Sequence, residues 1–510
     1  MNIKQAKQEI ANTLKAYLAK DGLGNYLIPP VRQRPVLLMG PPGVGKTQIM
    51  EQVAAETGVG LVAYTITHHT RQSAVGLPFI EKRTFGGEEF SVTEYTMSEI
   101  LASVYSLMEK TGLEEGILFL DEINCVSETL APMMLQFLQC KTFGNQRLPE
   151  GWLIAAAGNP PEYNRSVRDF DVVTLDRVKR IDVVEDFAVW KEYARAKGLH
   201  GAVVSYLDIK KENFYRVESS AEGIQFATAR GWEDLSELLT VYETLGLRTD
   251  REVVGQYIQL PRVARDFANY LELYNKYRKI YHVDDILRGA WQPITVRELR
   301  AAPFDEKLSV MGLLLSRLSE AARETRRRDA LCERLHAALT EFKEALAAGE
   351  KPAEVLETLA AGRRAALKRA RDAGQLEKQR QTLAQTEINA LEDYRRRLIQ
   401  ESLAESEAAM AAVRGWFGAE VEQRAAQAKG TREELDHAFA FLEETFGQGQ
   451  ELVLFVTELT AGADTSWFIE QFGCDAYFRH NRELLFDDSQ RRIREEIIAA
   501  KAAEQEETDD

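Results

Sequence analysis

Residues 40–47, with the sequence GPPGVGKT, constrain the fold of this 510-residue chain more than any other segment. They match the phosphate-loop pattern G-x-x-x-x-G-K-[ST], follow a short apolar run and open a helical stretch. Glycines let the backbone turn its N–H groups toward a phosphate, and the helix that follows adds its positive end. We therefore predict an ATP-binding loop formed by Gly40, Pro41, Pro42, Gly43, Val44, Gly45, Lys46 and Thr47. Within it, Lys46 should reach the β- and γ-phosphates and Thr47 should ligate Mg²⁺.

A second motif supports the first. The apolar run 117–120 ends in two acids, Asp121 and Glu122. An acid at the end of a buried strand beside a phosphate loop can hold Mg²⁺ through water, and Asp121 fits that role. Glu122 is placed to polarise an attacking water molecule. A pair of acids after a strand is a weak signal alone, and its weight comes from the loop upstream.

Short apolar runs separated by helical stretches predict the fold of the first part of the chain. The runs 35–39, 117–120 and 152–157 are apolar throughout, as expected for strands buried on both faces. Helical segments between them indicate βαβ units. The predicted fold class is an α/β P-loop core, with a parallel sheet flanked by helices. A helical lid and a mostly helical C-terminal region are expected to follow it.

The chain beyond this core is predicted to be helical. Phe267, Tyr270, Leu271 and Tyr274 recur at helical spacing in DFANYLELYNKY (266–277) and should be core residues of the lid. Leu391, Tyr394 and Leu398 indicate long amphipathic helices, as a hairpin or a partial coiled coil. Gly362 and Gly374 are expected to mark helix breaks. The predicted domains are residues 1–186 (core), 187–295 (lid), 296–440 (long-helix arm) and 441–510 (small helical end module with an acidic tail).

The motifs GPPGVGKT, ILFLDE and AAAGNPPE together resemble the Walker A, Walker B and sensor 1 elements of AAA+ ATPases. The sequences of these motifs are most similar to those of the MoxR-like branch, which is related to the dynein and midasin ATPase modules. The resemblance covers roughly residues 1–290. It implies a ring, typically a hexamer, that hydrolyses ATP with Mg²⁺.

The resemblance also implies roles for residues outside the first two motifs. Asn159 matches sensor 1, which helps to position the lytic water. Arg177 lies in a segment that resembles the one carrying the arginine finger, with Arg180 as the alternative.

Arg230 matches sensor 2 because Trp232 follows it, although the family more often has proline where Ala229 stands. A rival match for sensor 2 is Arg262, in residues 260–262. Residues 70–78 resemble the segment before the helix-2 insert, a loop that in relatives faces the ring pore. The predicted catalytic set is therefore Glu122, Asn159, Arg177 and Arg230.

Composition limits the partners and the compartment. The net charge of −16 disfavours nucleic acid, because an acidic chain repels phosphate backbones. The four cysteines form no C-x-x-C pair, so a zinc site is not expected. No apolar run is long enough to span a membrane and the N-terminus has no signal-peptide pattern, so a cytoplasmic protein is predicted.

The resemblance to MoxR-like ATPases implies a protein client or adaptor, such as a protein with a von Willebrand A domain. Remodelling of that partner is therefore the leading hypothesis. Two alternatives stay open at this point. One is a nucleotide-gated scaffold or switch with slow hydrolysis, and the other is a nucleic-acid translocase.

Overall fold

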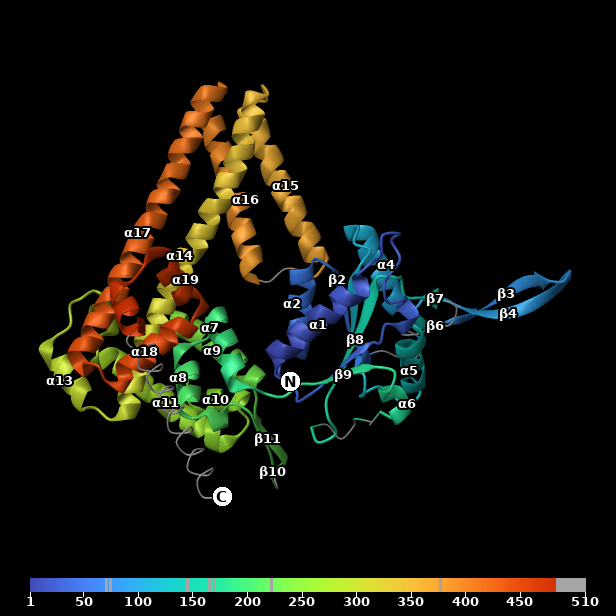
Figure 1. Ribbon diagram of the computed structural model, residues 1–510, viewed down its shortest axis with the longest axis horizontal. Helices are drawn as coiled ribbons and strands as arrows, with labels where there is room; N and C mark the ends of the chain where they lie inside the picture. Colours follow the sequence, from blue (N-terminus) through green and yellow to red (C-terminus); the bar gives the residue numbers. More distant parts are fainter. Residues whose placement is uncertain are drawn as a thin grey trace, which may run out of the picture. The chain divides into compact units, whose positions relative to one another are not determined.

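The computed structural model describes residues 1–68, 72, 76–143, 146–163, 167, 170–220, 223–375 and 378–482 (Figure 1). Their contacts define two compact units that alternate along the chain. Unit 1 comprises Met1–Val189, Thr228–Arg230 and Ala338–Ala409, and unit 2 comprises Trp190–Ala227, Gly231–Ala337 and Met410–Asp510. Most of residues 70–78, and all residues from 483 on, which include the predicted acidic tail 499–510, lie outside the described residues. The division into four domains stays a prediction.

Unit 1 is built around a parallel sheet of five described strands. These are β1 (Val36–Met39), β2 (Gly60–Thr65), β5 (Gly116–Asp121), β8 (Trp152–Gly158) and β9 (Lys179–Asp182). They lie in the order β2-β5-β8-β1-β9, and every neighbouring pair is parallel. The carboxyl ends of all the strands therefore meet at one end of the sheet. The three strands predicted from apolar runs are confirmed as β1, β5 and β8.

Helices cover both faces of this sheet, which explains why its central strands are apolar throughout. On one face lie α1 (Ile3–Leu18) and α2 (Lys46–Thr57), and on the other α4 (Glu99–Thr111) and α5 (Ala131–Cys140) (Figure 1). Successive side chains of a strand point to opposite faces. Accordingly Val36 and Leu38 of β1 join the core under α1 and α2, whereas Leu37 and Met39 join the core under α4 and α5.

Unit 1 also contains elements outside the sheet. An antiparallel hairpin of β3 (Pro78–Phe85) and β4 (Glu88–Tyr95) projects from it with mostly exposed side chains (Figure 1). The short elements are η1 (Pro30–Arg32), η2 (Ile66–His68), β6 (Thr142–Phe143), β7 (Gln146–Arg147) and α6 (Val172–Leu175).

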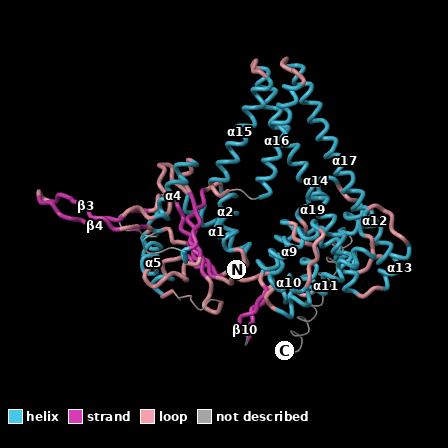
Figure 2. Tube along the Cα trace, turned by 180° about the vertical axis from the view of Figure 1, so that it is seen from behind, coloured by secondary structure: helices cyan, strands magenta, loops and turns pink. Residues whose placement is uncertain are grey.

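Two long helices, α15 (Pro352–Asp372) and α16 (Lys378–Gln400), form an antiparallel hairpin within unit 1 (Figure 2). Ion pairs join them: Arg363 donates to the buried carboxylate of Glu387 at 3.0 Å, and Arg395 donates to Glu357 at 2.9 Å. The helices and the breaking role of Gly374 are as predicted. The break predicted at Gly362 is wrong, because this exposed glycine lies inside α15. A partial coiled coil stays a prediction.

Unit 2 is almost entirely helical. Its elements are α7 (Phe187–Lys197), α8 (Gly201–Ile209), η3 (Lys211–Asn213), β10 (Arg216–Ser220), β11 (Gly223–Ala227), α9 (Ala229–Leu245), α10 (Arg251–Tyr257), α11 (Pro261–Ile280), α12 (Val283–Leu287), α13 (Pro293–Ala301), α14 (Phe304–Ala347), α17 (Ser406–Phe446), α18 (Gln450–Ala461) and α19 (Ala463–Phe472). Helices α14 and α17 continue into unit 1. The predicted aromatic row lies on α11, where Phe267 packs edge-on against Tyr206 and Trp232 with ring centroids 5.2 Å apart.

No single helix among the described residues has the length and apolar character to cross a membrane. The adjoining helices α18 and α19 meet that test only as a pair bent by 90°.

The pairing of Gly116 with Trp152 across β5 and β8 provides a test of the core. A Cβ at Gly116 would lie 2.6 Å from the Trp152 ring, so Gly116→Ala should destabilise the protein by about 1–3 kcal/mol through overpacking. The matched control is Gly362→Ala, where a Cβ meets nothing within 4 Å and helix propensity should add up to about 1 kcal/mol. Urea unfolding of both variants measures these changes, and equal stability of the two would contradict the packing.

Candidate active site

The loop of residues 40–47 connects the carboxyl end of β1 to the start of α2, and its glycines are required by its geometry. Gly43 and Gly45 have positive φ angles of 77° and 92°, and Gly45 is the N-cap of α2. Gly40 has a different reason: a Cβ there would lie 2.5 Å from the carbonyl oxygen of Val183, which follows β9. The loop therefore wraps tightly at the end of the sheet, with the positive end of α2 behind it.

Lys46 links this loop to the neighbouring strand β8. Its Nζ donates hydrogen bonds to the carbonyl oxygens of Gly40 and Pro41, both at 2.8 Å, and to Oδ1 of Asn159 at 2.9 Å. Three donated bonds use all the protons of an ammonium group. Burial lowers the pKa of Lys46 to about 8, against the opposing effect of the Asp121 carboxylate. Burial thus makes the charged form of Lys46 less stable, and an anionic ligand such as a phosphate would stabilise that form.

Thr47 and Asp121 bring two hard oxygen ligands together. The Thr47 hydroxyl donates to Oδ2 of Asp121 at 2.9 Å, from the first turn of α2 to the last residue of β5. The other oxygen of Asp121 accepts a bond from the backbone N–H of Glu122 at 2.9 Å. Hydroxyl and carboxylate oxygens are the donors that Mg²⁺ prefers.

Glu122 adopts an unusual backbone conformation directly after β5. Its φ of 57° lies in the left-handed region, which a residue with a Cβ rarely adopts. Its carboxylate is held, because the Thr67 hydroxyl donates to Oε2 at 3.0 Å. Thr67 lies two residues beyond the end of β2, the strand that neighbours β5.

Asn159 follows β8, and hydrogen bonds hold both its side chain and its backbone. Its side-chain oxygen accepts the bond from Lys46, and its backbone carbonyl accepts one from Nδ2 of Asn124 at 2.8 Å. Asn124 is buried, and its Oδ1 has no hydrogen-bond partner among the described residues. A Cβ at Gly158 would lie 2.6 Å from that oxygen, so the approach of Asn124 requires glycine.

Of the two rival arginines for sensor 2, Arg230 reaches the loop. Residues Thr228–Arg230 belong to unit 1, and a Cβ at Gly43 would lie 3.3 Å from the Cβ of Arg230. The charge of Arg230 is also one cause of the lowered pKa of Lys46. Arg262 belongs to unit 2 and forms an ion pair with Glu218 of β10.

The two candidates for the finger lie away from these contacts on exposed positions. Arg177, between α6 and β9, donates to the side-chain oxygen of Gln139 on α5. Arg180, on the edge strand β9, forms an ion pair with Asp182 at 2.8 Å. The charge of Arg177 also acts on the nearby carboxylate of Asp171, so both candidates have an acidic neighbour.

The structure thus joins Lys46, Thr47, Asp121, Glu122, Asn159 and Arg230 at one end of the sheet, and leaves Arg177 on the surface. Sequence reasoning missed Thr67 and Asn124. Asn124 could have been found three residues after Asp121 in the same motif. Thr67 could have been found by recognising β2, whose sequence GLVAYT contains the apolar run 61–64, as long as the run 117–120.

Comparison with known proteins agrees with this geometry. Residues 36–175 match the family described as ATPase family associated with various cellular activities (AAA). No curated protein matches the chain. Residues 36–175 therefore form an AAA domain, and a domain of this family supports ATP hydrolysis as a general activity.

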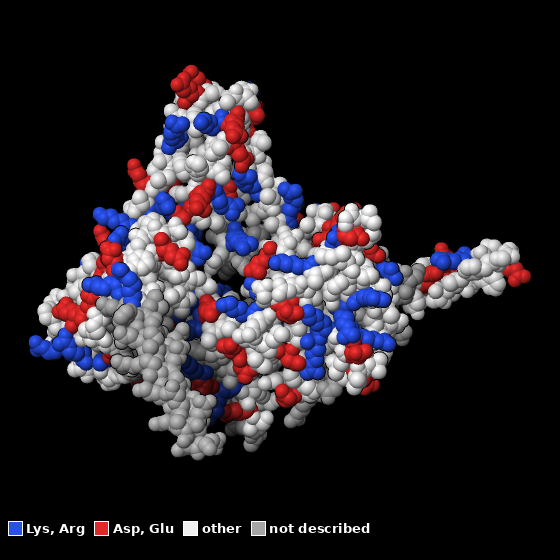
Figure 3. Space-filling view, in the orientation of Figure 1, with Lys and Arg blue, Asp and Glu red and all other residues white. Residues whose placement is uncertain are grey.

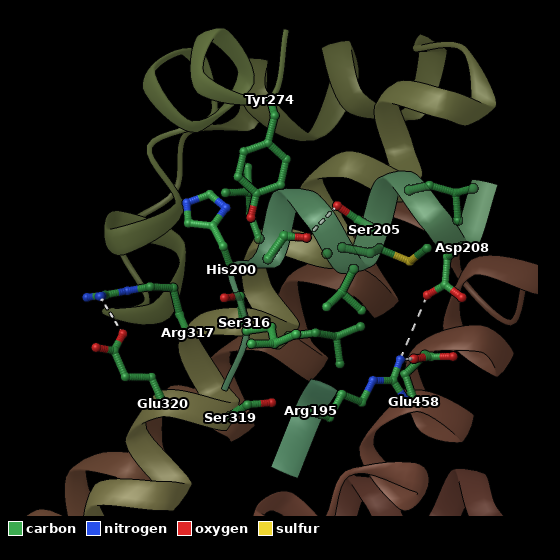
Figure 4. Close-up of a pocket in the computed structure, with 18 of the residues that line it drawn as sticks. Arg195, His200, Ser205, Asp208, Tyr274, Ser316, Arg317, Ser319, Glu320 and Glu458 are labelled. Atoms are coloured by element: carbon green, nitrogen blue, oxygen red, sulfur yellow. Dashed lines mark hydrogen bonds and ion pairs between the residues drawn. The ribbon is translucent and has the colours of Figure 1, made fainter. Parts of the chain in front are cut away.

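Unit 2 contains a separate pocket of about 710 Å³ (Figure 4). The charged side chains at its two ends are paired with one another. Arg195 lies against Glu458 and Asp208 at one end, and Arg317 pairs with Glu320 at the other. These ion pairs account for the charges without a ligand.

The lowered pKa of Lys46 predicts how nucleotide affinity depends on pH. Above about pH 8 the free site increasingly holds a neutral lysine, whereas the phosphates of ATP favour the charged form. Affinity should therefore fall as pH rises through this value, by about tenfold between pH 7 and pH 9. Calorimetric titration with a nonhydrolysable ATP analogue measures this. Lys46→Met should bind weakly at every pH, and equal affinity of the wild type at pH 7 and pH 9 would contradict the assignment.

Proposed function

We propose that this site hydrolyses ATP with Mg²⁺, and that the chain works in a ring, typically a hexamer, to remodel or activate a partner protein. One observation carries the proposal. Side chains from the carboxyl ends of three adjacent strands, β1, β5 and β8, converge through the bonds Lys46–Asn159 and Thr47–Asp121. Such an arrangement matches what phosphoryl transfer requires, namely positioning and charge stabilisation.

The donor set fits ATP and Mg²⁺. The glycine loop, the N-terminus of α2 and Lys46 supply hydrogen-bond donors and positive charge for phosphate oxygens. Mg²⁺ would be held by Thr47 directly and by Asp121 through water, and it would neutralise charge on the phosphates. No group of three or more His, Cys, Asp or Glu side chains in the described part of the chain could hold a metal. Mg²⁺ at phosphates needs only one or two protein ligands.

Glu122 is the proposed base that polarises the attacking water, and Asn159 positions that water beside the terminal phosphate. Asn124 orients Asn159 through its backbone, so it is a positioning residue. Arg230 supplies further positive charge near the loop.

Arg177 is the proposed finger that completes the site of the neighbouring subunit. Its exposure supports this role, because an arginine that acts on another subunit must be able to leave its resting contact, here with Gln139.

The partner follows from the resemblance to MoxR-like ATPases, which typically act with proteins that carry a von Willebrand A domain. A nucleic-acid translocase is disfavoured, since basic and acidic side chains are interspersed over the face shown in Figure 3. The slow switch is the second candidate, and the bond from Thr67 to Glu122 favours it, because a carboxylate that already accepts a hydrogen bond is a weaker base toward water.

Glu122→Gln tests the proposed base and the proposed partner together. The variant should bind ATP and lose at least about 10²-fold in turnover, because an amide cannot accept the proton from water. Purification of this trapped form from native lysate with ATP and Mg²⁺, followed by mass spectrometry, should enrich the client or adaptor. Lys46→Ala, which should not load nucleotide, is the control. A protein enriched equally by both variants would count against remodelling, and turnover equal to the wild type would exclude Glu122 as the base.

A mixing experiment tests the finger. Arg177→Ala and Lys46→Ala should each be inactive, since one lacks the finger and the other lacks its own nucleotide. Mixed rings should regain activity wherever an intact site faces an intact Arg177, as measured by phosphate release against mixing ratio. Arg180→Ala is the matched control and should keep activity. No recovery at any ratio would refute action between subunits.

A further inference from the structure

The hairpin α15–α16 is attached to the edge of the sheet by the turn that joins its two helices. The backbone N–H of Leu61 donates to the carbonyl oxygen of Ala373 at 3.2 Å, and Nε2 of Gln375 donates to the carbonyl oxygen of Val59 at 2.9 Å. Strand β2 is the outermost described strand on this side, so its outward backbone groups need partners other than a strand. The turn supplies two of them.

This attachment is closely packed. Ala373 is buried, with 2% of its surface exposed, and Gly374 has a φ of 70°, so the turn requires glycine. A Cβ at Gly374 would lie 3.5 Å from Leu61. Helix α15 also packs on α4, which in turn binds β2 through the Tyr64 hydroxyl and the carbonyl oxygen of Glu99 at 3.3 Å. The hairpin, α4 and the edge strand therefore form one connected body.

The other end of the same strand reaches the proposed reacting groups. Thr65, the last residue of β2, pairs in register with Asp121, and Thr67 holds the Glu122 carboxylate. A strand of six residues spans about 20 Å and is stiff along its axis. Residues 373–375, which we call the root of the hairpin, contact one end of β2. The proposed base, Glu122, lies near the other end of this short strand.

We propose that the α15–α16 hairpin is a sensor that sets the orientation of Glu122 through β2, with Gln375 as a positioning residue. The inference rests on the proposed role of Glu122 as the base. While the hairpin root is docked, β2 keeps Thr67 within reach of Glu122 and hydrolysis is slow. A load on the hairpin that weakens the root lets β2 shift, frees the carboxylate and raises turnover. Short turns join the hairpin to α14, which ends at Ala347, and to α17, which begins at Ser406, so a load on either helix can reach the hairpin.

Gln375→Glu tests the root with little change in size, because a carboxylate cannot donate to the Val59 carbonyl. Its kcat should rise about two- to tenfold, the range that one hydrogen bond supplies, with KM and nucleotide affinity unchanged. Gln375→Ala repeats the test if the first variant does not fold. The control is Gln385→Ala, which removes only a bond to Asn389 within α16 and should keep wild-type kcat.

Coupling to Thr67 separates a sensor from a merely structural contact. Thr67→Val should itself raise kcat, and Gln375→Glu should then add nothing, because the bond it weakens is already absent. Independent, multiplying effects of the two changes, or an unchanged kcat in both Gln375 variants, would overturn the sensor. If Glu122→Gln hydrolyses ATP normally, the proposed function fails instead. If Glu122→Gln does not hydrolyse ATP and both Gln375 variants keep the wild-type kcat, the sensor is refuted and the proposed function is not.

Discussion

The site depends on one buried cation. Lys46 joins the loop after β1 to the residue after β8 by three hydrogen bonds, and its burial makes the free charge expensive. The three acceptors are two carbonyl groups of the loop itself and the amide of Asn159. The loop is thereby held in a folded form before any phosphate arrives, and an arriving phosphate meets a lysine whose charge lacks a full counter-charge.

The parallel sheet makes this convergence possible. Because all strands run in one direction, residues that follow β1, β2, β5 and β8 meet at one end, although they are far apart in sequence. Trp152, Phe119 and Leu38 fix the strands from within, and the loops that follow hold the polar groups. Packing thus sets the distances, and side chains such as Asn124 and Thr67 adjust the orientations.

The sequence predicted the central strands and the residues of the loop because both have short-range signals. A phosphate loop is fixed by spacing, and a strand buried on both faces is apolar throughout. The edge strand β9 lacks that signal, whereas β2 has the apolar run 61–64 but was not recognised, and Thr67 was missed with it. Gly362 was misread because a glycine on an exposed helix face costs only about 1 kcal/mol, which the ion pair of Arg363 with Glu387 and the packing of α15 can offset. The bond between Leu61 and Ala373 joins residues more than three hundred positions apart, and no local pattern predicts it.

The most direct test of the account is phosphate release by the purified chain with ATP, compared in excess Mg²⁺ and in excess EDTA. The account predicts turnover within the usual enzyme range, of the order of one per second or above when the base is free, and its loss in EDTA. Release that is no faster than that of Lys46→Ala, in Mg²⁺ and at micromolar protein, would contradict it.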